Sequence, residues 1–262
     1  MFMEKIVVGT YEEDFTQFEI FCYCLNKNWK GNKQITVFVG SYNNEPGNID
    51  QVQSTVDLHL PSWNVEVVDG YQPLAVDGYA EQNINKIVNS FDLDHAIVFD
   101  SKDFMVRSMD LTDFMVDDCL ALSYFETAQT HYDLYPASKK IFDNLNIPTT
   151  LNLTPWIWDS VVLKHMWNKH HDEFYKGNCT EWDSYLTYAV GTNSVKLPAF
   201  KERVIVSGGW THQDYDGMLA QKQQVIDFDH KKIWKHSRKL EDPRCSDVTN
   251  QVLSHFDIPL TI

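Results

Sequence analysis

Short apolar segments alternate with amphipathic ones along the first hundred residues of the chain. Four of the segments are rich in β-branched or aromatic side chains, which is typical of buried strands: residues 6–8, 35–39, 65–68 and 96–99. Apolar residues recur at the spacing of one helix face over residues 15–28 and again over residues 81–90. The order β-α-β-β-α-β predicts an α/β fold.

The second half of the chain is less regular. Two more strands are expected, at residues 120–124 and 204–206. Helices are expected from residue 159 or 160 to residue 174, over residues 182–190 and over residues 247–256. The sequence has no internal repeat and no linker rich in Pro, Gly or Ser, so we expect a single domain spanning residues 1–262.

The apolar run at residues 96–99 ends abruptly in Asp100-Ser101-Lys102-Asp103. In mainly parallel sheets, ligands bind just beyond the carboxyl ends of the strands. Asp100 and Asp103 therefore offer oxygen ligands for a divalent cation at that edge, and Lys102 offers a positive charge to a phosphate. The alternative interpretation is a strand followed by a solvated turn.

The charge balance limits the expected partners. With 22 basic and 37 acidic residues the net charge is −15, so the bulk of the surface repels nucleic-acid backbones and anionic membranes. No apolar run approaches the roughly 18 to 20 residues that span a bilayer, and we expect no membrane span. The five cysteines are scattered and the amino terminus lacks the pattern of a signal peptide. We therefore expect a cytoplasmic location.

Several common chemistries lack their motifs in this sequence. There is neither a Gly-x-x-x-x-Gly-Lys-Ser/Thr loop nor a Gly-x-Gly-x-x-Gly fingerprint after the first predicted strand. Gly-x-Ser-x-Gly and His-Glu-x-x-His are absent as well. The phosphate-binding, dinucleotide-binding, hydrolase and zinc sites that these motifs build are therefore not expected.

Four sequence motifs together carry a family resemblance. They are residues 78–86 (Gly-Tyr-Ala-Glu-Gln-Asn-Ile-Asn-Lys), the strand ending in Asp100-Ser101-Lys102, residues 155–158 (Pro-Trp-Ile-Trp) and residues 180–185 (Thr-Glu-Trp-Asp-Ser-Tyr). Over about residues 5–190, their order resembles that of nucleotide-sugar glycosyltransferases of the GT-A fold. More narrowly, it resembles a bacterial and phage branch in which a Gly-aromatic-x-x-Gln-x-x-x-Lys helix precedes an Asp-x-Asp-like turn.

The resemblance implies a GT-A-like (Rossmann-like) α/β fold, with a mixed, mainly parallel sheet flanked by helices. It implies a nucleotide-sugar-binding half at about residues 1–125 and an acceptor-side half at about residues 126–262. The expected partners are a nucleotide-sugar donor, UDP-linked by default, and an acceptor saccharide or small hydroxyl compound. The expected location is then the cytoplasm of a bacterium or of a phage-infected host cell.

Donor-binding residues follow from the same resemblance. The end of the first strand is expected to hold the nucleotide base with Thr10, Tyr11 and Asp14. Gln82 and Lys86, on the helix before the acidic turn, are expected to face the donor.

The acidic turn is expected to hold the ribose, the diphosphate and a metal through Asp100, Lys102 and Asp103. This turn departs from strict Asp-x-Asp spacing, because Lys102 stands where the second acid belongs. Either Asp103 takes over as the ligand of Mn²⁺ or Mg²⁺, or Lys102 replaces the cation. In both cases a positive charge stabilises the diphosphate leaving group.

Glu181 and Asp183 stand where the resemblance expects an acid facing the acceptor. A carboxylate there can accept the proton of the acceptor hydroxyl as a general base. The alternative is that both residues solubilise the start of a helix, where acidic side chains interact favourably with the helix dipole.

Residues 230–239 form a basic segment in an otherwise acidic chain. The resemblance implies a metal ligand, His230 or His236, and a diphosphate contact, Lys231 or Lys235. Two alternatives remain open. The segment is either a solvated basic face, or it holds DNA whose hydroxymethylated bases are the acceptor.

Two other classes of function also remain open. One is a sugar-nucleotide or carbohydrate-binding domain without catalysis, because a fold alone does not determine function. The other is a nucleotidyltransferase, although the turn at residues 9–14 is acidic where that class has a basic, glycine-rich loop.

Overall fold

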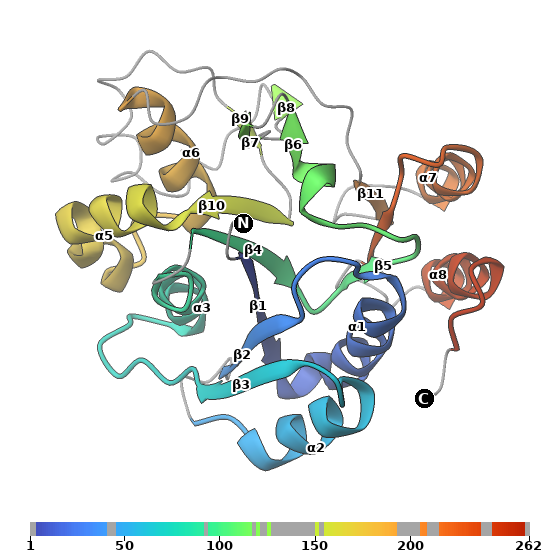
Figure 1. Ribbon diagram of the computed structural model, residues 1–262, viewed down its shortest axis with the longest axis horizontal. Helices are drawn as coiled ribbons and strands as arrows, with labels where there is room; N and C mark the ends of the chain where they lie inside the picture. Colours follow the sequence, from blue (N-terminus) through green and yellow to red (C-terminus); the bar gives the residue numbers. More distant parts are fainter. Residues whose placement is uncertain are drawn as a thin grey trace.

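A computed structural model of the chain describes residues 4–40, 46–91, 94–116, 119–120, 125–126, 150–151, 155–192, 205–208, 215–236 and 243–259. Its centre is a five-stranded sheet in the order β10-β4-β1-β2-β3 (Figure 1). Four of these strands are parallel: β1 (Glu4–Tyr11), β2 (Gln34–Gly40), β3 (Asn64–Asp69) and β4 (His95–Asp100). The fifth, β10 (Trp156–Asp159), is antiparallel to β4. The predicted mixed, mainly parallel sheet is confirmed.

Helices cover both faces of this sheet. Figure 1 shows α1 (Phe15–Asn28) and α2 (Ile49–His59) on one side, with α3 (Gly78–Val88) and α5 (Ser160–Tyr175) on the other. Alternate side chains of β1 enter two hydrophobic clusters, as the two-residue period of a strand requires. One cluster includes Val8 and Phe21, and the other includes Val7, Ile84 and Leu163.

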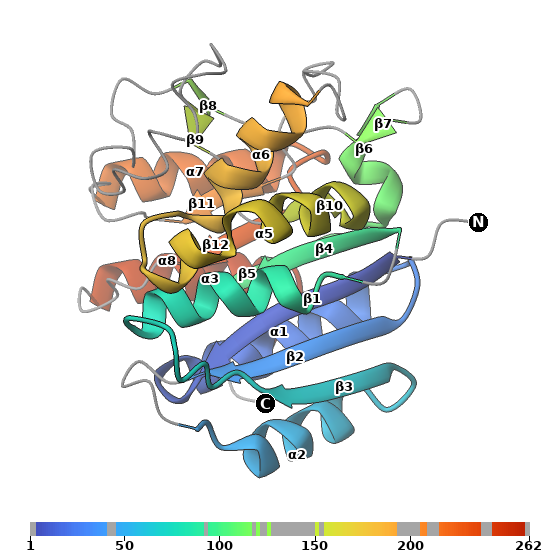
Figure 2. The same cartoon turned by 90° about the vertical axis from the view of Figure 1, so that its left-hand side faces the viewer.

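A second, three-stranded sheet joins distant parts of the chain. Its order is β11-β12-β5, formed by β11 (Ile205–Gly208), β12 (Ile233–His236) and β5 (Asp103–Met105). Because β5 begins three residues after β4 ends, this sheet starts directly at the acidic turn (Figure 2). Strand β12 is antiparallel to β5, with Lys235 opposite Asp103.

The remaining elements are helices and short segments. The helices are α6 (Glu181–Gly191), α7 (Tyr215–Asp227) and α8 (Pro243–His255). The short segments are η1 (Glu12–Asp14), η2 (Leu111–Phe114), β6 (Met115–Val116), β7 (Cys119–Leu120), β8 (Phe125–Glu126) and β9 (Thr150–Leu151). Within the parts of the chain described above, no helix is both long and apolar enough to cross a bilayer.

The predicted elements differ from these in several places. The helix predicted at 15–28 is confirmed, and Asp159 caps α5 by accepting hydrogen bonds from the main-chain N–H groups of Val161 and Val162. Helices α2 and α7 and strands β5, β10 and β12 were not predicted, because they are short or rich in polar or aromatic residues. Of the strand expected at 120–124, residues 121–124 lie outside the described parts, as does residue 204 of the strand expected at 204–206.

Arg107 holds together the elements that surround the second sheet. Its guanidinium donates hydrogen bonds to main-chain carbonyls at the end of α7 and in the following turn, those of Val225, Ile226, Phe228 and Lys231. It also stacks over the ring of Phe256, 4.7 Å from the centroid, beyond the end of α8. This turn leads directly into β12, so Arg107 helps to fix the position of the strand that carries Lys235.

Replacing Arg107 with lysine should lower the free energy of unfolding by about 2–3 kcal/mol. A single ammonium group cannot reach four carbonyls, and hydrogen bonds to charged groups contribute about 1.5–3 kcal/mol each. Urea unfolding followed by circular dichroism measures the change. The control is Lys222→Ala on α7, where the ammonium group meets the side chain of Gln251 and little change is expected. A fully stable Arg107→Lys protein would contradict this role.

Candidate functional site

The acidic turn lies at the carboxyl ends of β1 and β4. Asp100 is the last residue of β4 and pairs with Gly9 of β1, where a Cβ atom would approach the ring of Phe38 to 2.3 Å. The turn is closed by a hydrogen bond of 2.8 Å from the main-chain N–H of Asp100 to Oδ2 of Asp103. The Asp100 side chain is partly exposed and Asp103 is fully buried. Asp100 is therefore the carboxylate that a ligand meets first.

Two lysines flank the Asp100 carboxylate. Lys86 Nζ lies 2.9 Å from Asp100 Oδ1 and 3.1 Å from Glu181 Oε1. Lys235 Nζ lies 2.7 Å from Asp100 Oδ2 and 2.8 Å from Asp103 Oδ1. We call these five residues the ion-pair cluster. They come from α3, β4, β5, α6 and β12, so the cluster exists only where both sheets and two helices meet.

Burial and the opposite charges shift the pKa values in the cluster. Burial alone would raise the pKa of Asp100, but the ammonium groups of Lys235 and Lys86 hold it well below its usual range. Burial alone would lower the pKa of both lysines, yet their carboxylate partners raise these pKa values above the usual range. Asp100, Lys86 and Lys235 therefore remain charged throughout the physiological pH range.

Glu181 behaves differently from Asp100. Burial is the largest cause and raises the pKa of its carboxyl group, while Lys86 lowers it. Its Oε1 accepts from Lys86, and its buried Oε2 has no hydrogen-bond partner among the described residues. The alternative of a solubilising residue at the start of α6 is wrong for Glu181, which is only 2% exposed. An unpaired, buried acceptor of this kind is costly and marks a candidate proton acceptor.

Aromatic side chains form the wall beside Lys86. Lys86 Nζ lies 4.8 Å from the ring centroid of Trp156, in cation–π geometry. The Trp156 ring stacks between Trp158 and Trp182, at centroid separations of 5.9 and 5.7 Å. All three indoles are buried, which makes them part of the hydrophobic core. The Nε1 atom of Trp156 has no hydrogen-bond partner among the described residues.

Lys102 does not stand between Asp100 and Asp103. Its ammonium group pairs with Asp14, with Nζ 2.6 Å from Oδ1, and both side chains are largely buried. The expectation that Lys102 replaces a cation at the acidic turn is therefore wrong in its geometry. The pair instead joins the turn to the end of β1, where Thr10 and Tyr11 are also buried. Thr10 Oγ1 has no hydrogen-bond partner among the described residues.

The other predicted residues lie around the cluster or outside the described side chains. Gln82 is half-buried on α3. Lys231 and His230 are half-buried before β12, and the His230 ring packs against Phe228 at a centroid distance of 5.6 Å. The side chains of Asp183 and His236 lie outside the described parts.

Asp100 and Asp103 do not fit a divalent cation as they are arranged. Each carboxylate oxygen of Asp100 and Asp103 already accepts a hydrogen bond from an N–H group. The described parts of the chain contain no group of three or more His, Cys, Asp or Glu side chains that could hold a metal ion. Dependence on Mn²⁺ or Mg²⁺ stays an untested prediction.

Two buried residues of α3 were missed by the sequence analysis. Oε2 of Glu81 accepts from the main-chain N–H of Gln72 at 3.3 Å, and Asn85 donates to the carbonyl of Gly70. Together they hold the loop after β3 against α3. Their spacing of four residues, on the same helix as Lys86, was the available signal that one face of this helix is polar and faces the protein.

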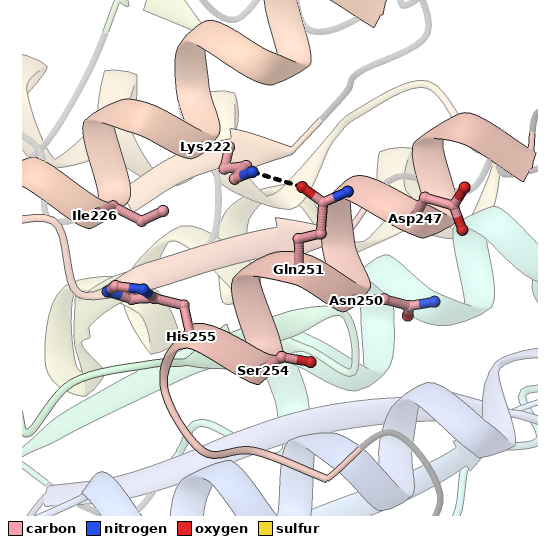
Figure 3. Close-up of a pocket in the computed structure, with 7 residues that line it drawn as sticks. All are labelled: Lys222, Ile226, Asp247, Asn250, Gln251, Ser254 and His255. Carbon is pink, nitrogen blue, oxygen red and sulfur yellow. Dashed lines mark hydrogen bonds between the residues drawn. The ribbon is translucent and has the colours of Figure 1, made fainter.

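A separate hollow lies between α7 and α8 (Figure 3). It measures about 500 Å³, and its lining includes Lys222, Asp247, Gln251 and His255. Figure 3 shows the hydrogen bond from Lys222 to Gln251 across it. None of its lining residues belongs to the ion-pair cluster, so the acidic turn remains the candidate site.

Sequence comparisons give one family and no characterised relative. The profile of a family described as a family of unknown function (DUF6492) matches residues 8–242. No curated protein matches the chain.

Comparison with solved structures gives the fold. WbbM, a bifunctional glycosyltransferase in its apo form, is 11% identical with a TM-score of 0.55, over 96% of this chain and 50% of that one. The apo form of the glycosyltransferase GlyE of Streptococcus pneumoniae TIGR4 is 12% identical with a TM-score of 0.48, over 96% of this chain and 63% of that one. The chain thus spans about half the length of WbbM. At this identity the likeness to WbbM shows a glycosyltransferase-like fold.

The contacts of Lys86 lead to a test of coupling. Lys86→Met should lower the free energy of unfolding by about 3–5 kcal/mol, because it leaves a buried carboxylate without its cation. In a Glu181→Gln background the loss should be smaller, since the amide carries no charge. Urea unfolding of the wild type, both single variants and the double variant measures the coupling. Equal losses in the two backgrounds would show that Lys86 and Glu181 do not interact.

Proposed function

The chain belongs to the DUF6492 family, and because that family has no assigned function, we propose from the site itself that the protein is a glycosyltransferase. It moves a sugar from a nucleotide-sugar donor, UDP-linked by default, to a hydroxyl group of a saccharide or small acceptor. The observation that carries the proposal is the ion-pair cluster at the ligand-binding edge of the sheet. It combines two ammonium groups with a buried carboxylate, one oxygen of which has no hydrogen-bond partner among the described residues.

The donor end of the site follows the strands. In this proposal the nucleotide base and ribose would bind at Thr10 and Tyr11, at the end of β1, and at Asp14 in η1. The diphosphate would bind near the acidic turn, beside the ammonium groups of Lys86 and Lys235 that flank Asp100. Ammonium groups held in place before the reaction stabilise the negative charge that develops on the leaving diphosphate.

The acceptor end of the site is Glu181. In a direct displacement, the acceptor oxygen forms a bond to the anomeric carbon while its proton moves to Glu181 Oε2. The bond from the anomeric carbon to the diphosphate oxygen breaks, and its electron pair stays on the diphosphate. Lys86 holds Oε1 of the same carboxylate, which orients Oε2. Because Oε2 is buried, the acceptor reaches it only after the covering residues move.

DNA is the weaker acceptor hypothesis. Lys235 is buried in the cluster, and Lys232 pairs with Asp113, with 2.6 Å between Nζ and Oδ1. Two lysines of the basic segment are thus already neutralised within the protein. Lys231 is half-buried, and Arg238 and Lys239 lie outside the described parts. A saccharide or small hydroxyl compound is therefore preferred.

Hydrolysis of nucleotide sugars in the absence of an acceptor tests the class of enzyme. We expect slow release of a nucleoside diphosphate from one donor in a panel, because water can replace the acceptor. Asp100→Asn should abolish the release, since the amide no longer balances Lys86 and Lys235. Circular dichroism checks that the variant is folded, and Asp216→Asn on α7 is the matched control. Binding of a donor without release would favour the non-catalytic alternative, and no binding to any donor would reject the proposal.

The pH dependence of the same reaction tests Glu181. A general base acts only as a carboxylate, and burial raises the pKa of Glu181 above its usual range. We therefore expect kcat/KM to fall as the pH decreases through a pKa higher than that of an ordinary glutamate. Glu181→Gln should lower kcat by about 100- to 10,000-fold without loss of donor affinity and should remove this limb. Glu173→Gln on α5 is the control, and an active Glu181→Gln enzyme with an unchanged profile would exclude the role.

A further inference from the structure

We propose that the ammonium group of Lys235 takes the place of a divalent cation between Asp100 and Asp103, so that donor turnover at this site needs no metal ion. This inference rests on the proposed glycosyltransferase function and concerns the same site. It assigns to a residue of β12 the charge that the sequence led us to expect from a metal ion or from Lys102.

The hydrogen bonds of the two carboxylates carry the argument. Asp100 Oδ1 accepts from Lys86, and Asp100 Oδ2 accepts from Lys235. Asp103 Oδ1 accepts from Lys235, and Asp103 Oδ2 accepts from the main-chain N–H of Asp100. The ammonium group of Lys235 thus contacts both carboxylates at once. It bridges them as a shared metal ion would, at hydrogen-bond rather than coordination distances.

The position of Lys235 is built into the second sheet. Lys235 on β12 lies opposite Asp103 on β5, and the two residues before it, Ile233 and Trp234, are fully buried. Trp234 Nε1 donates to Thr249 of α8 at 3.1 Å, which anchors the strand from the other side. The lysine side chain itself is only 9% exposed. A metal ion would have to expel a side chain that the sheet holds in place.

Charge balance points the same way. The carboxylates of Asp100 and Asp103 are matched by the ammonium groups of Lys86 and Lys235, so this part of the cluster is neutral. The two carboxylates are already balanced, so a divalent cation placed there would gain little net attraction to offset the loss of its hydration water. A diphosphate bound beside these ammonium groups would use them in the reaction itself: as its bond to the anomeric carbon breaks, they would stabilise the electron pair left on its oxygen.

The wild-type protein provides the first test. Hydrolysis of the donor that it accepts is measured after removal of metals, with EDTA present, and again with added Mn²⁺ or Mg²⁺. We expect the EDTA rate to stay within about twofold of the rate with metal. A fall of about tenfold or more in EDTA, reversed by Mn²⁺, would overturn the proposal.

Binding of Mn²⁺ alone, followed by electron paramagnetic resonance, provides a test without any donor. The wild-type protein should not take up Mn²⁺ at the acidic turn. Lys235→Ala should take it up, because the variant removes the ammonium group that bridges the two carboxylates and, with it, the positive charge between them. In the same variant, hydrolysis should become dependent on Mn²⁺. Lys235→Arg keeps the charge and should not bind Mn²⁺.

The matched control is Lys232→Ala, a lysine of the same segment whose partner is Asp113 rather than the cluster. It should behave as the wild type in both assays. Thermal melting confirms that each variant is folded. If Lys235→Ala does not fold, hydrolysis in EDTA and Mn²⁺ binding by the wild-type protein still test whether the site needs a metal ion. A folded Lys235→Ala protein that binds no Mn²⁺, or a wild-type protein that binds Mn²⁺ in a manner lost in Asp103→Asn, would overturn the inference. If no donor is hydrolysed, the proposed function fails, while the Mn²⁺ measurement still tests the inference.

Discussion

The carboxylate of Asp100, held between the ammonium groups of Lys86 and Lys235, is the interaction on which the rest of the site depends. Removing an ion from water costs several kcal/mol, and only close opposite charges and hydrogen bonds offset that cost. Lys86 and Lys235 are themselves buried, so each ammonium group also needs a second carboxylate to offset its own loss of hydration. Lys86 uses Glu181 and Lys235 uses Asp103. The chain of alternating charges therefore fixes how closely α3, α6, β5 and β12 approach one another.

The antiparallel strand β10 explains how the second half of the chain reaches this cluster. It lies beside β4, so Trp156 at its start lies across from Val98, two residues before the acidic turn. The indole then contacts Lys86, and the chain returns through α5 to place Glu181, the first residue of α6, 3.1 Å from the same ammonium group. The stacked tryptophans thus position charged groups, although they belong to the hydrophobic core.

Much of the fold and part of the site were available from the sequence. The apolar run at 96–99 followed by acids predicted the ligand edge of the sheet, and the family resemblance predicted that Lys86 faces the donor there. The partner of Asp103 was not predictable in this way, because Lys235 lies 132 residues away and no local spacing links the two. Lys235 was expected to contact the diphosphate from a basic segment, and the basic composition gave no sign that the segment contains a buried strand. Lys102 had the right neighbours in sequence, but the turn directs it toward Asp14.

The separation of these partners along the chain also has a consequence for folding. Strands β1 to β4 lie within the first hundred residues and can pair early, whereas the bridge from Lys235 to Asp103 closes a loop of more than a hundred residues. Contacts of such high sequence separation form slowly because their loop-closure entropy is large. Until β12 docks, burying Asp103 would leave its charge uncompensated, so the acidic turn stays hydrated in partly folded chains. The ion-pair cluster is therefore completed last, when the second sheet closes.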